Sequence, residues 1–156
     1  MKKQDLISRL ALVAAISLSP WSHAVFADVV VPAIGAFASD GSIYGGESPD
    51  AHKPMYTTPA DAPDPVSWSD ANDYCSTLRS FGHDDWRVPS KKELEVLYEN
   101  QKKEALNETF KEIGDSAGWY WSSSESDGGQ AWVQNFGKGT QNQDYQDNRS
   151  SLRCVR

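Results

Sequence analysis

Residues 85–94 read DWRVPSKKEL, and this stretch combines a turn, a core tryptophan and the start of a helix. Ser90 is followed three residues later by Glu93, which is the spacing of a capping box. Pro89 precedes the cap, where it does not interrupt the helix. The pattern predicts a helix that begins after Ser90, with a buried stripe made of Leu94, Leu97, Tyr98 and Gln101.

The two residues in front of Val88 are interpreted as structural. Trp86 lies between a turn and a capped helix, which predicts a core residue whose indole N–H finds a local partner. Arg87 is interpreted as one half of a structural ion pair or as a clamp on the backbone, rather than as an anion site.

Another helix is predicted upstream. Ser67 is a typical N-cap residue, and Asp70 is its expected reciprocal partner. Gly82 is expected to end this helix. Its inward face carries, at helical spacing, Trp68, Ala71, Cys75 and Leu78.

The remaining segments alternate between strands and loops. Residues 59–66 (PADAPDPV) contain three prolines and are predicted to be loop. The predicted strands are residues 42–45, 53–58, 119–121, 131–136 and 151–155. In the fourth strand, Trp132 and Phe136 are expected on one face, and Ala131 and Val133 on the other. Two helices followed by an antiparallel meander predict an α+β fold.

The N-terminus has the parts of a secretory signal peptide. A basic head precedes the apolar residues 10–18 (LALVAAISL), and small residues follow at signal-peptidase spacing. The apolar run is far shorter than the roughly 20 residues that a membrane span needs. Cleavage is expected after Ala24 or after Ala27. The predicted organisation is a signal peptide (1–27), a lead-in segment (28–41) and one domain (42–156), exported to the periplasm, the cell surface or the medium.

The mature chain is expected to be acidic. The formal charge of the full chain is −7, and removal of Lys2, Lys3, Arg9 and Asp5 with the signal changes it to −9. Nucleic acids and anionic lipids favour clustered Lys and Arg, so they are poor candidate partners. No second apolar run is long enough to span a membrane. We therefore expect no nucleic-acid partner and no membrane span after signal removal.

Cys75 and Cys154 are the only cysteines of the chain. An even number in an exported protein favours a disulfide, which would close a loop of about 79 residues. Two free thiols, a redox pair or a metal pair are the alternatives. Cys-x-x-Cys is absent, and His52 and His83 do not complete a zinc-ligand spacing.

Five motifs occur in a fixed order along the chain. They are Trp68-x-x-Ala71-x-x-x-Cys75-x-x-Leu78, DWRVPS-x-x-EL at 85–94, WYWSSS at 119–124, Ala131-Trp132, and LRCVR at 152–156. This set resembles the Lcl C-terminal domain family over residues 42–156. The resemblance implies a C-type-lectin-like α+β domain, with two helices packed on a small twisted antiparallel sheet and long loops. It also implies that a Cys of the first helix pairs with a Cys of the last strand, and that the domain is an adhesin-like binding module rather than an enzyme.

Ligand sets known from similar folds are missing here. C-type lectins hold calcium and sugar with a Glu-Pro-Asn or Gln-Pro-Asp triplet and a Trp-Asn-Asp motif, but the corresponding stretch here is Trp132-Val133-Gln134. The copper-binding Cys pair of formylglycine-generating enzymes is not available, because both cysteines are assigned to the disulfide. We therefore expect no cofactor and no metal.

Residues 141–150 (QNQDYQDNRS) contain no aliphatic side chain. Such a run does not suit a core, because each buried amide needs partners. A solvated loop is the simplest interpretation. The alternative is a recognition face for a glycan or a protein, formed with residues 122–130 and 137–139, because this composition is typical of binding loops. The candidate ligand-binding residues are Trp119, Trp121, Ser124, Gln130, Trp132, Gln134, Gln141, Gln143, Tyr145, Asp147 and Asn148.

Three tryptophans near this run, at 119, 121 and 132, include a candidate exposed platform for a sugar ring. Catalysis has little support, because no nucleophile elbow, phosphate loop or His-Glu-x-x-His motif occurs. A hydrolase that acts on glycans with paired carboxylates and a purely structural envelope component are the alternatives. Some lectin-like families are diversified in a C-terminal segment by retroelements that rewrite adenines. The Asn, Asp, Tyr and Ser content of residues 122–150 fits this hypothesis.

Overall fold

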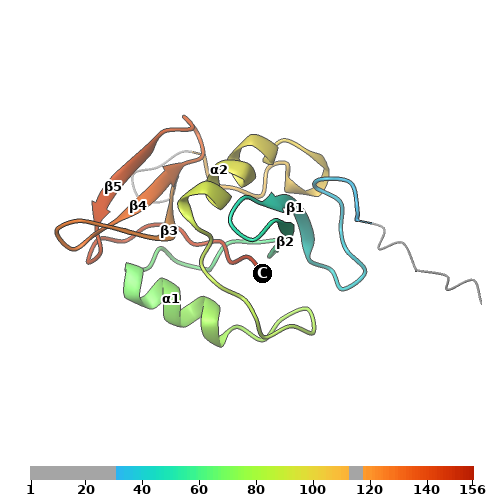
Figure 1. Ribbon diagram of the computed structural model, residues 1–156, viewed down its shortest axis with the longest axis horizontal. Helices are drawn as coiled ribbons and strands as arrows, with labels where there is room; N and C mark the ends of the chain where they lie inside the picture. Colours follow the sequence, from blue (N-terminus) through green and yellow to red (C-terminus); the bar gives the residue numbers. More distant parts are fainter. Residues whose placement is uncertain (1–30, 113–117) are drawn as a thin grey trace, which may run out of the picture.

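The computed structural model describes residues 31–112 and 118–156 (Figure 1). In chain order the elements are β1 (Ile43–Ser48), β2 (Lys53–Thr57), α1 (Trp68–Thr77), α2 (Lys91–Asn100), a short 3₁₀ helix η1 (Glu104–Leu106), β3 (Trp119–Ser126), β4 (Gln130–Asn135) and β5 (Gln141–Tyr145). Two helices and two small antiparallel sheets confirm the predicted α+β fold. Within these two ranges, no helix is long and apolar enough to cross a bilayer. The predicted signal peptide lies outside the described residues.

Both helices begin at the predicted caps. At α2, Ser90 Oγ accepts a hydrogen bond from the N–H of Glu93, and the Glu93 carboxylate accepts one from the N–H of Ser90, so the capping box is complete. At α1, Ser67 Oγ accepts a hydrogen bond from the N–H of Asp70, but the Asp70 carboxylate does not accept the expected reciprocal bond from the N–H of Ser67. This helix ends at Thr77, well before Gly82, because Leu78 adopts an extended conformation and packs against the core.

The C-terminal sheet is a meander in the order β3-β4-β5. The strand β5 corrects the sequence interpretation, in which residues 141–150 were expected to be a loop. Its register runs from Gln134 opposite Gln141 to Gln130 opposite Tyr145. Because β4 supplies main-chain hydrogen-bond partners, this polar segment stays in the sheet without an aliphatic side chain. The strand β3 likewise extends to Ser126, into the region expected to be a loop.

The C-terminal segment joins both sheets and the DWR stretch. It was predicted as a strand over 151–155, but it makes single bridges instead, from Ser151 to Tyr120 and from Val155 to both Thr57 and Arg87. Its side chains alternate between the two core clusters. Leu152 and Cys154 point into one cluster, as predicted, and Val155 points into the other.

The first core cluster lies between α1 and the C-terminal sheet. Its buried members are Ala62, Ala71, Cys75, Trp86, Val88, Trp121, Ala131, Val133, Leu152 and Cys154. Trp86 is 2% exposed, and its indole N–H donates to the carbonyl of Ser80 at 3.1 Å, which confirms the predicted local partner. Arg87 also has the predicted structural role, because its guanidinium forms two hydrogen bonds to the carboxylate of Glu93.

The second core cluster lies under α2. It consists of Ile43, Met55, Leu94, Leu97, Leu106, Phe110, Tyr120, Phe136 and Val155. Leu94 and Leu97 supply the buried stripe of α2 that the capping-box pattern predicted, and Gln101 continues it with 7% exposure. The first cluster packs α1 against one side of the C-terminal sheet, and the second packs α2 against the other side (Figure 1).

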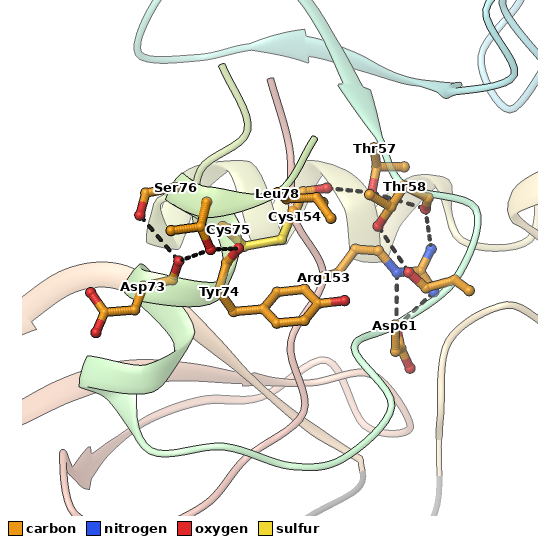
Figure 2. Close-up of a disulfide and its surroundings, with 12 residues drawn as sticks. Thr57, Thr58, Asp61, Asp73, Tyr74, Cys75, Ser76, Leu78, Arg153 and Cys154 are labelled. Atoms are coloured by element: carbon orange, nitrogen blue, oxygen red, sulfur yellow. Dashed lines mark hydrogen bonds and ion pairs between the residues drawn. A yellow bond between two sulfur atoms is a disulfide. The ribbon is translucent and has the colours of Figure 1, made fainter. Parts of the chain in front are cut away.

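The disulfide joins α1 to the C-terminal segment. Cys75 and Cys154 are bonded, with their Cα atoms 5.7 Å apart, and the described chain has no free cysteine. Figure 2 shows the bridge beside Arg153, which reaches to Asp61. The pairing that the family resemblance implies is therefore confirmed.

The predicted lead-in segment packs onto the domain over its described part. The N–H of Gly35 donates to the carbonyl of Tyr44, and the N–H of Tyr44 donates to the carbonyl of Ala36. Asp40 is tied to Ser42 by two hydrogen bonds. The folded unit therefore begins before residue 42, because these residues extend the β1 edge.

Candidate functional site

The residues of the C-terminal sheet alternate between two faces. Phe136, directly after β4, packs in the cluster under α2, whereas Ala131 and Val133 of β4 pack in the cluster beside α1. We call these the α2 face and the α1 face. The β4–β5 register places Gln141, Gln143 and Tyr145 on the α2 face, and Asn142 and Asp144 on the α1 face.

A hollow of about 410 Å³ opens at the α1 face, and we call it the C-terminal hollow. Its lining consists of Trp119, Val133, Asn142, Gln143, Asp144, Asn148, Arg149 and Ser150. Apart from the indole and one valine, all of these side chains are polar. The hollow therefore offers hydrogen bonds over most of its surface and one aromatic ring.

Asp144 is held in place within the hollow. Its Oδ1 accepts hydrogen bonds from the N–H of Tyr145 at 2.9 Å and from Nδ2 of Asn148 at 2.6 Å. Nothing in the described part of the chain donates to the second carboxylate oxygen. A carboxylate fixed by one oxygen presents the other as an acceptor for ligand hydroxyl or N–H groups.

Arg149 is anchored from the other side. Its Nε donates to the carbonyl of Pro65 at 3.0 Å, and the residue is otherwise exposed. Over residues 31–112 and 118–156, its two terminal nitrogens have no protein acceptor. The planar fork of a guanidinium held in this way is suited to carboxylate, carbonyl or hydroxyl oxygens of a ligand.

Trp119 supplies the aromatic part of the hollow. It is half-buried and packs against the first core cluster, so its position is supported from behind. An indole that is partly exposed at a polar hollow offers apolar area and a stacking surface together.

The structure brings together some of the predicted site residues but not others. Trp119 and Asn148 line the hollow, and Asp147 is exposed in the adjacent turn. Gln143 borders the hollow, although the β4–β5 register turns its side chain to the α2 face. Ser124 belongs to β3, and its Oγ accepts a hydrogen bond from the N–H of Lys91, the first residue of α2. On the α2 face, and away from the hollow, are Gln130, Trp132, Gln141 and Tyr145.

Two predicted residues are part of the scaffold. Trp121 is 0% exposed, and its indole N–H donates to the carbonyl of Val66 at 2.8 Å. Gln134 is also 0% exposed and donates to the carbonyl of Gly139. A ligand on the surface cannot reach either side chain, because the core clusters on both sides of the sheet cover them.

The aromatic residues of the α2 face differ in how open they are. The Lys91 ammonium lies 3.0 Å from the centroid of the Trp132 ring, so it covers one face of that indole. Tyr145 is 61% exposed. The most open aromatic side chain of the predicted set is therefore a tyrosine and not a tryptophan.

Sequence reasoning missed five residues of the hollow. One is Val133, and the other four, Asn142, Asp144, Arg149 and Ser150, belong to the polar run that the sequence singled out. The period of a strand would have separated residues 142 and 144 from residues 141, 143 and 145. A run without apolar residues does not reveal that period. Among the described residues, no group of His, Cys, Asp and Glu is arranged to hold a metal ion.

Comparison with known proteins identifies the family of this domain. The model of the Lcl C-terminal domain matches residues 47–156, which include both helices, both cysteines and the whole hollow. The chain belongs to the Lcl C-terminal domain family. Among solved structures it is similar to botrocetin, with 12% sequence identity and a TM-score of 0.43, over 65% of this chain and 89% of that chain. No curated protein matches it.

The domain matches what the resemblance implies in three respects. Two helices pack with small antiparallel sheets, the first helix is bonded to the C-terminal segment, and long connections surround this frame. In this Lcl C-terminal domain, β5, which supplies part of the lining of the hollow, lies on the opposite side of the domain from the 31–44 segment (Figure 1).

Proposed function

We propose that this Lcl C-terminal domain is an exported, adhesin-like recognition module that binds a glycan or a protein through the C-terminal hollow. The observation that carries the proposal is the lining of the hollow. It combines an indole, a fixed carboxylate, an anchored guanidinium and the amide side chains of Asn142 and Asn148. Such a set matches ligands that are rich in hydroxyl, amide or carboxylate groups and have one apolar face.

Main-chain hydrogen bonds and the disulfide hold the scaffold under the hollow, which supports a binding role. β5 and the 146–150 turn are attached to β4 and to the 65–66 loop by main-chain hydrogen bonds. The disulfide anchors the C-terminal segment four residues beyond Ser150, at Cys154. A preorganised site loses less conformational entropy when a ligand binds, so polar contacts are sufficient for affinity.

The hollow favours binding over hydrolysis. Glycoside hydrolases use two carboxyl groups that flank the scissile bond. Asp144 is the single carboxylate in the lining, and one of its oxygens is already occupied by Tyr145 and Asn148. We therefore propose a non-catalytic role.

Export is part of the proposal. A disulfide between Cys75 and Cys154 persists in oxidising compartments, which agrees with the predicted signal peptide. The ligand is accordingly expected outside the cytoplasm, in the periplasm, at the cell surface or in the medium.

The test is a glycan and protein array probed with the purified mature chain. Trp119→Ala should reduce binding to the captured ligand more than about tenfold, which corresponds to about 1.4 kcal/mol of binding free energy. Arg149→Ala should weaken it as well. Arg79→Ala is the matched control, because Arg79 is also exposed and also donates to main-chain carbonyls, but it does not line the hollow. Equal binding by wild type and Trp119→Ala would place the recognition surface elsewhere.

A diversified C-terminal segment extends this proposal. Apart from Trp119, all residues that line the hollow lie within the segment 122–150. We expect the exposed side chains of this segment to tolerate polar substitutions, because exposed loop side chains contribute little to core burial. A near-identical template repeat beside a reverse transcriptase gene, with mismatches confined to adenines, is the expected genomic signature. A neighbourhood without either feature would contradict diversification and leave the binding proposal intact.

A further inference from the structure

Three of the four sheet edges are covered by main chain. Residues 35–38 pair with the outer side of β1, residues 154–156 pair with the outer side of β2, and Ser151 pairs with the outer side of β3. In the described part of the chain, β5 is the strand whose outer edge receives no neighbouring strand (Figure 1). An uncovered edge is a template for pairing with another chain.

The hydrogen bonds at the two ends of the β4–β5 ladder show which groups face outward. The N–H of Asn135 donates to the carbonyl of Thr140, and the N–H of Gln146 donates to the carbonyl of Gly129. Hydrogen-bonded pairs alternate along an antiparallel ladder, so residues 142 and 144 also direct their main-chain groups to β4. The main-chain groups of residues 141, 143 and 145 therefore point to the open edge.

Three of the six outward main-chain groups of residues 141, 143 and 145 are already occupied, two of them by side chains. Asn142 Oδ1 accepts the N–H of Gln143 at 2.9 Å, and Asp144 Oδ1 accepts the N–H of Tyr145 at 2.9 Å. The carbonyl of Tyr145 accepts the N–H of Asn148 at 2.9 Å. An incoming strand would have to break these bonds before it could form its own ladder.

We infer that the side chains of Asn142 and Asp144 close the free edge of β5 against strand addition. The partner that they exclude is a second copy of this chain, paired edge to edge through β5. In such a pair the two Asp144 carboxylates would approach the same short interface, and like charges across paired strands are unfavourable. The inference does not depend on the proposed ligand, because it rests on the hydrogen bonds at the open edge of β5.

The first test is amide hydrogen exchange in the mature protein, followed by NMR. In Asn142→Ala/Asp144→Ala, the amides of Gln143 and Tyr145 should exchange severalfold faster than in wild type, because their acceptors are gone. The control variant Gln143→Ala/Tyr145→Ala retains both acceptors and should leave the amides of 143 and 145 at their wild-type rates. Asn142→Asp/Asp144→Asn also retains them and should behave in the same way. Unchanged exchange in the double alanine variant would overturn the inference.

The second test is association, measured by sedimentation over a range of concentrations. The double alanine variant should self-associate more strongly than wild type. Adding Gln143→Pro to it should abolish the gain, because proline removes an outward N–H that an added strand would use. The inference is also overturned if the double alanine variant associates no more than wild type, or if the proline leaves the gained association intact.

Discussion

Arg153 and Asp61 form an ion pair inside the domain, with Arg153 Nη2 2.7 Å from Asp61 Oδ1 (Figure 2). The Arg153 side chain is 0% exposed and the Asp61 side chain 7%. Tyr120 completes the arrangement by donating its hydroxyl to Asp61 Oδ2 at 2.6 Å. Burial and the neighbouring Asp61 raise the pKa of Tyr120, so its hydroxyl keeps its proton and remains a donor. The pair holds the 58–62 loop against the C-terminal segment that carries Cys154.

Removal of one partner of this pair should be costly. Asp61→Ala leaves the Arg153 charge buried without a counter-ion, so the free energy of unfolding should fall by about 3–5 kcal/mol in urea denaturation. Asp84→Ala is the control, because Asp84 is exposed, and its effect should stay within about 0.5 kcal/mol. A loss for Asp61→Ala as small as that of the control would show that the pair contributes little.

The disulfide should contribute stability through the unfolded chain. Cys75 and Cys154 are 79 residues apart, and chain entropy predicts about 4.5 kcal/mol for a loop of that length before any strain. Replacing either cysteine should cost about 2–5 kcal/mol. The double replacement should cost about the same as one, because a single thiol cannot re-form the bridge. Peptide mapping under non-reducing conditions, on protein produced with its native N-terminal segment, should recover the two linked peptides, and free thiols at both positions would contradict this prediction.

Asp40 should make stability depend on pH in the acid range. Burial alone would raise its pKa, but hydrogen bonds from Ser42 and His83 and the charge of Arg156 lower it from 3.8 to about 2. Because the pKa is lower in the folded state, the contribution of Asp40 is present above about pH 4 and is lost as the pH falls towards 2. Asp40→Asn should therefore be less stable than wild type at neutral pH, and the difference should shrink below pH 4. A difference that stays constant from pH 7 to 2 would show that the charge has no role.

Calcium should have little effect on thermal stability. The sequence lacks the carboxylate–amide triplet of calcium-binding lectins, so the melting temperature is expected to be the same in excess calcium and in excess chelator. A ligand that binds the native state tightly must raise the melting temperature. A rise of many degrees with calcium would therefore reveal a site among the acidic residues of the C-terminal loops.

Local signals were sufficient to predict the helices and the frame of the fold. The caps at Ser67 and Ser90 act over three residues, so they are legible in the sequence and are present in the structure. The alternation along β4 predicted both of its faces, because apolar residues mark each one. Two cysteines in a chain with a predicted secretory signal left few alternatives to a disulfide, and the family motifs indicated which elements it joins.

The candidate site was predicted only in part. The polar run at 141–150 was located correctly as a surface, but its division into two faces was not visible, because both faces of β5 are polar. The same limit applied to the tryptophans. Trp119 and Trp121 have similar local sequence, yet one borders the hollow and the other is fully buried.

The sequence by itself determined what depends on near neighbours: the helix starts, the amphipathic faces and the identity of the paired cysteines. Only the tertiary structure decided that Arg153 meets Asp61, that β5 is a strand, and that Asn142 and Asp144 occupy its open edge. The physical reason is that a polar side chain has no preferred partner until the chain closes around it. Its hydrogen bonds depend on residues tens of positions away. In β5 the main-chain partners come from β4, and the polar sequence of β5 does not indicate this pairing.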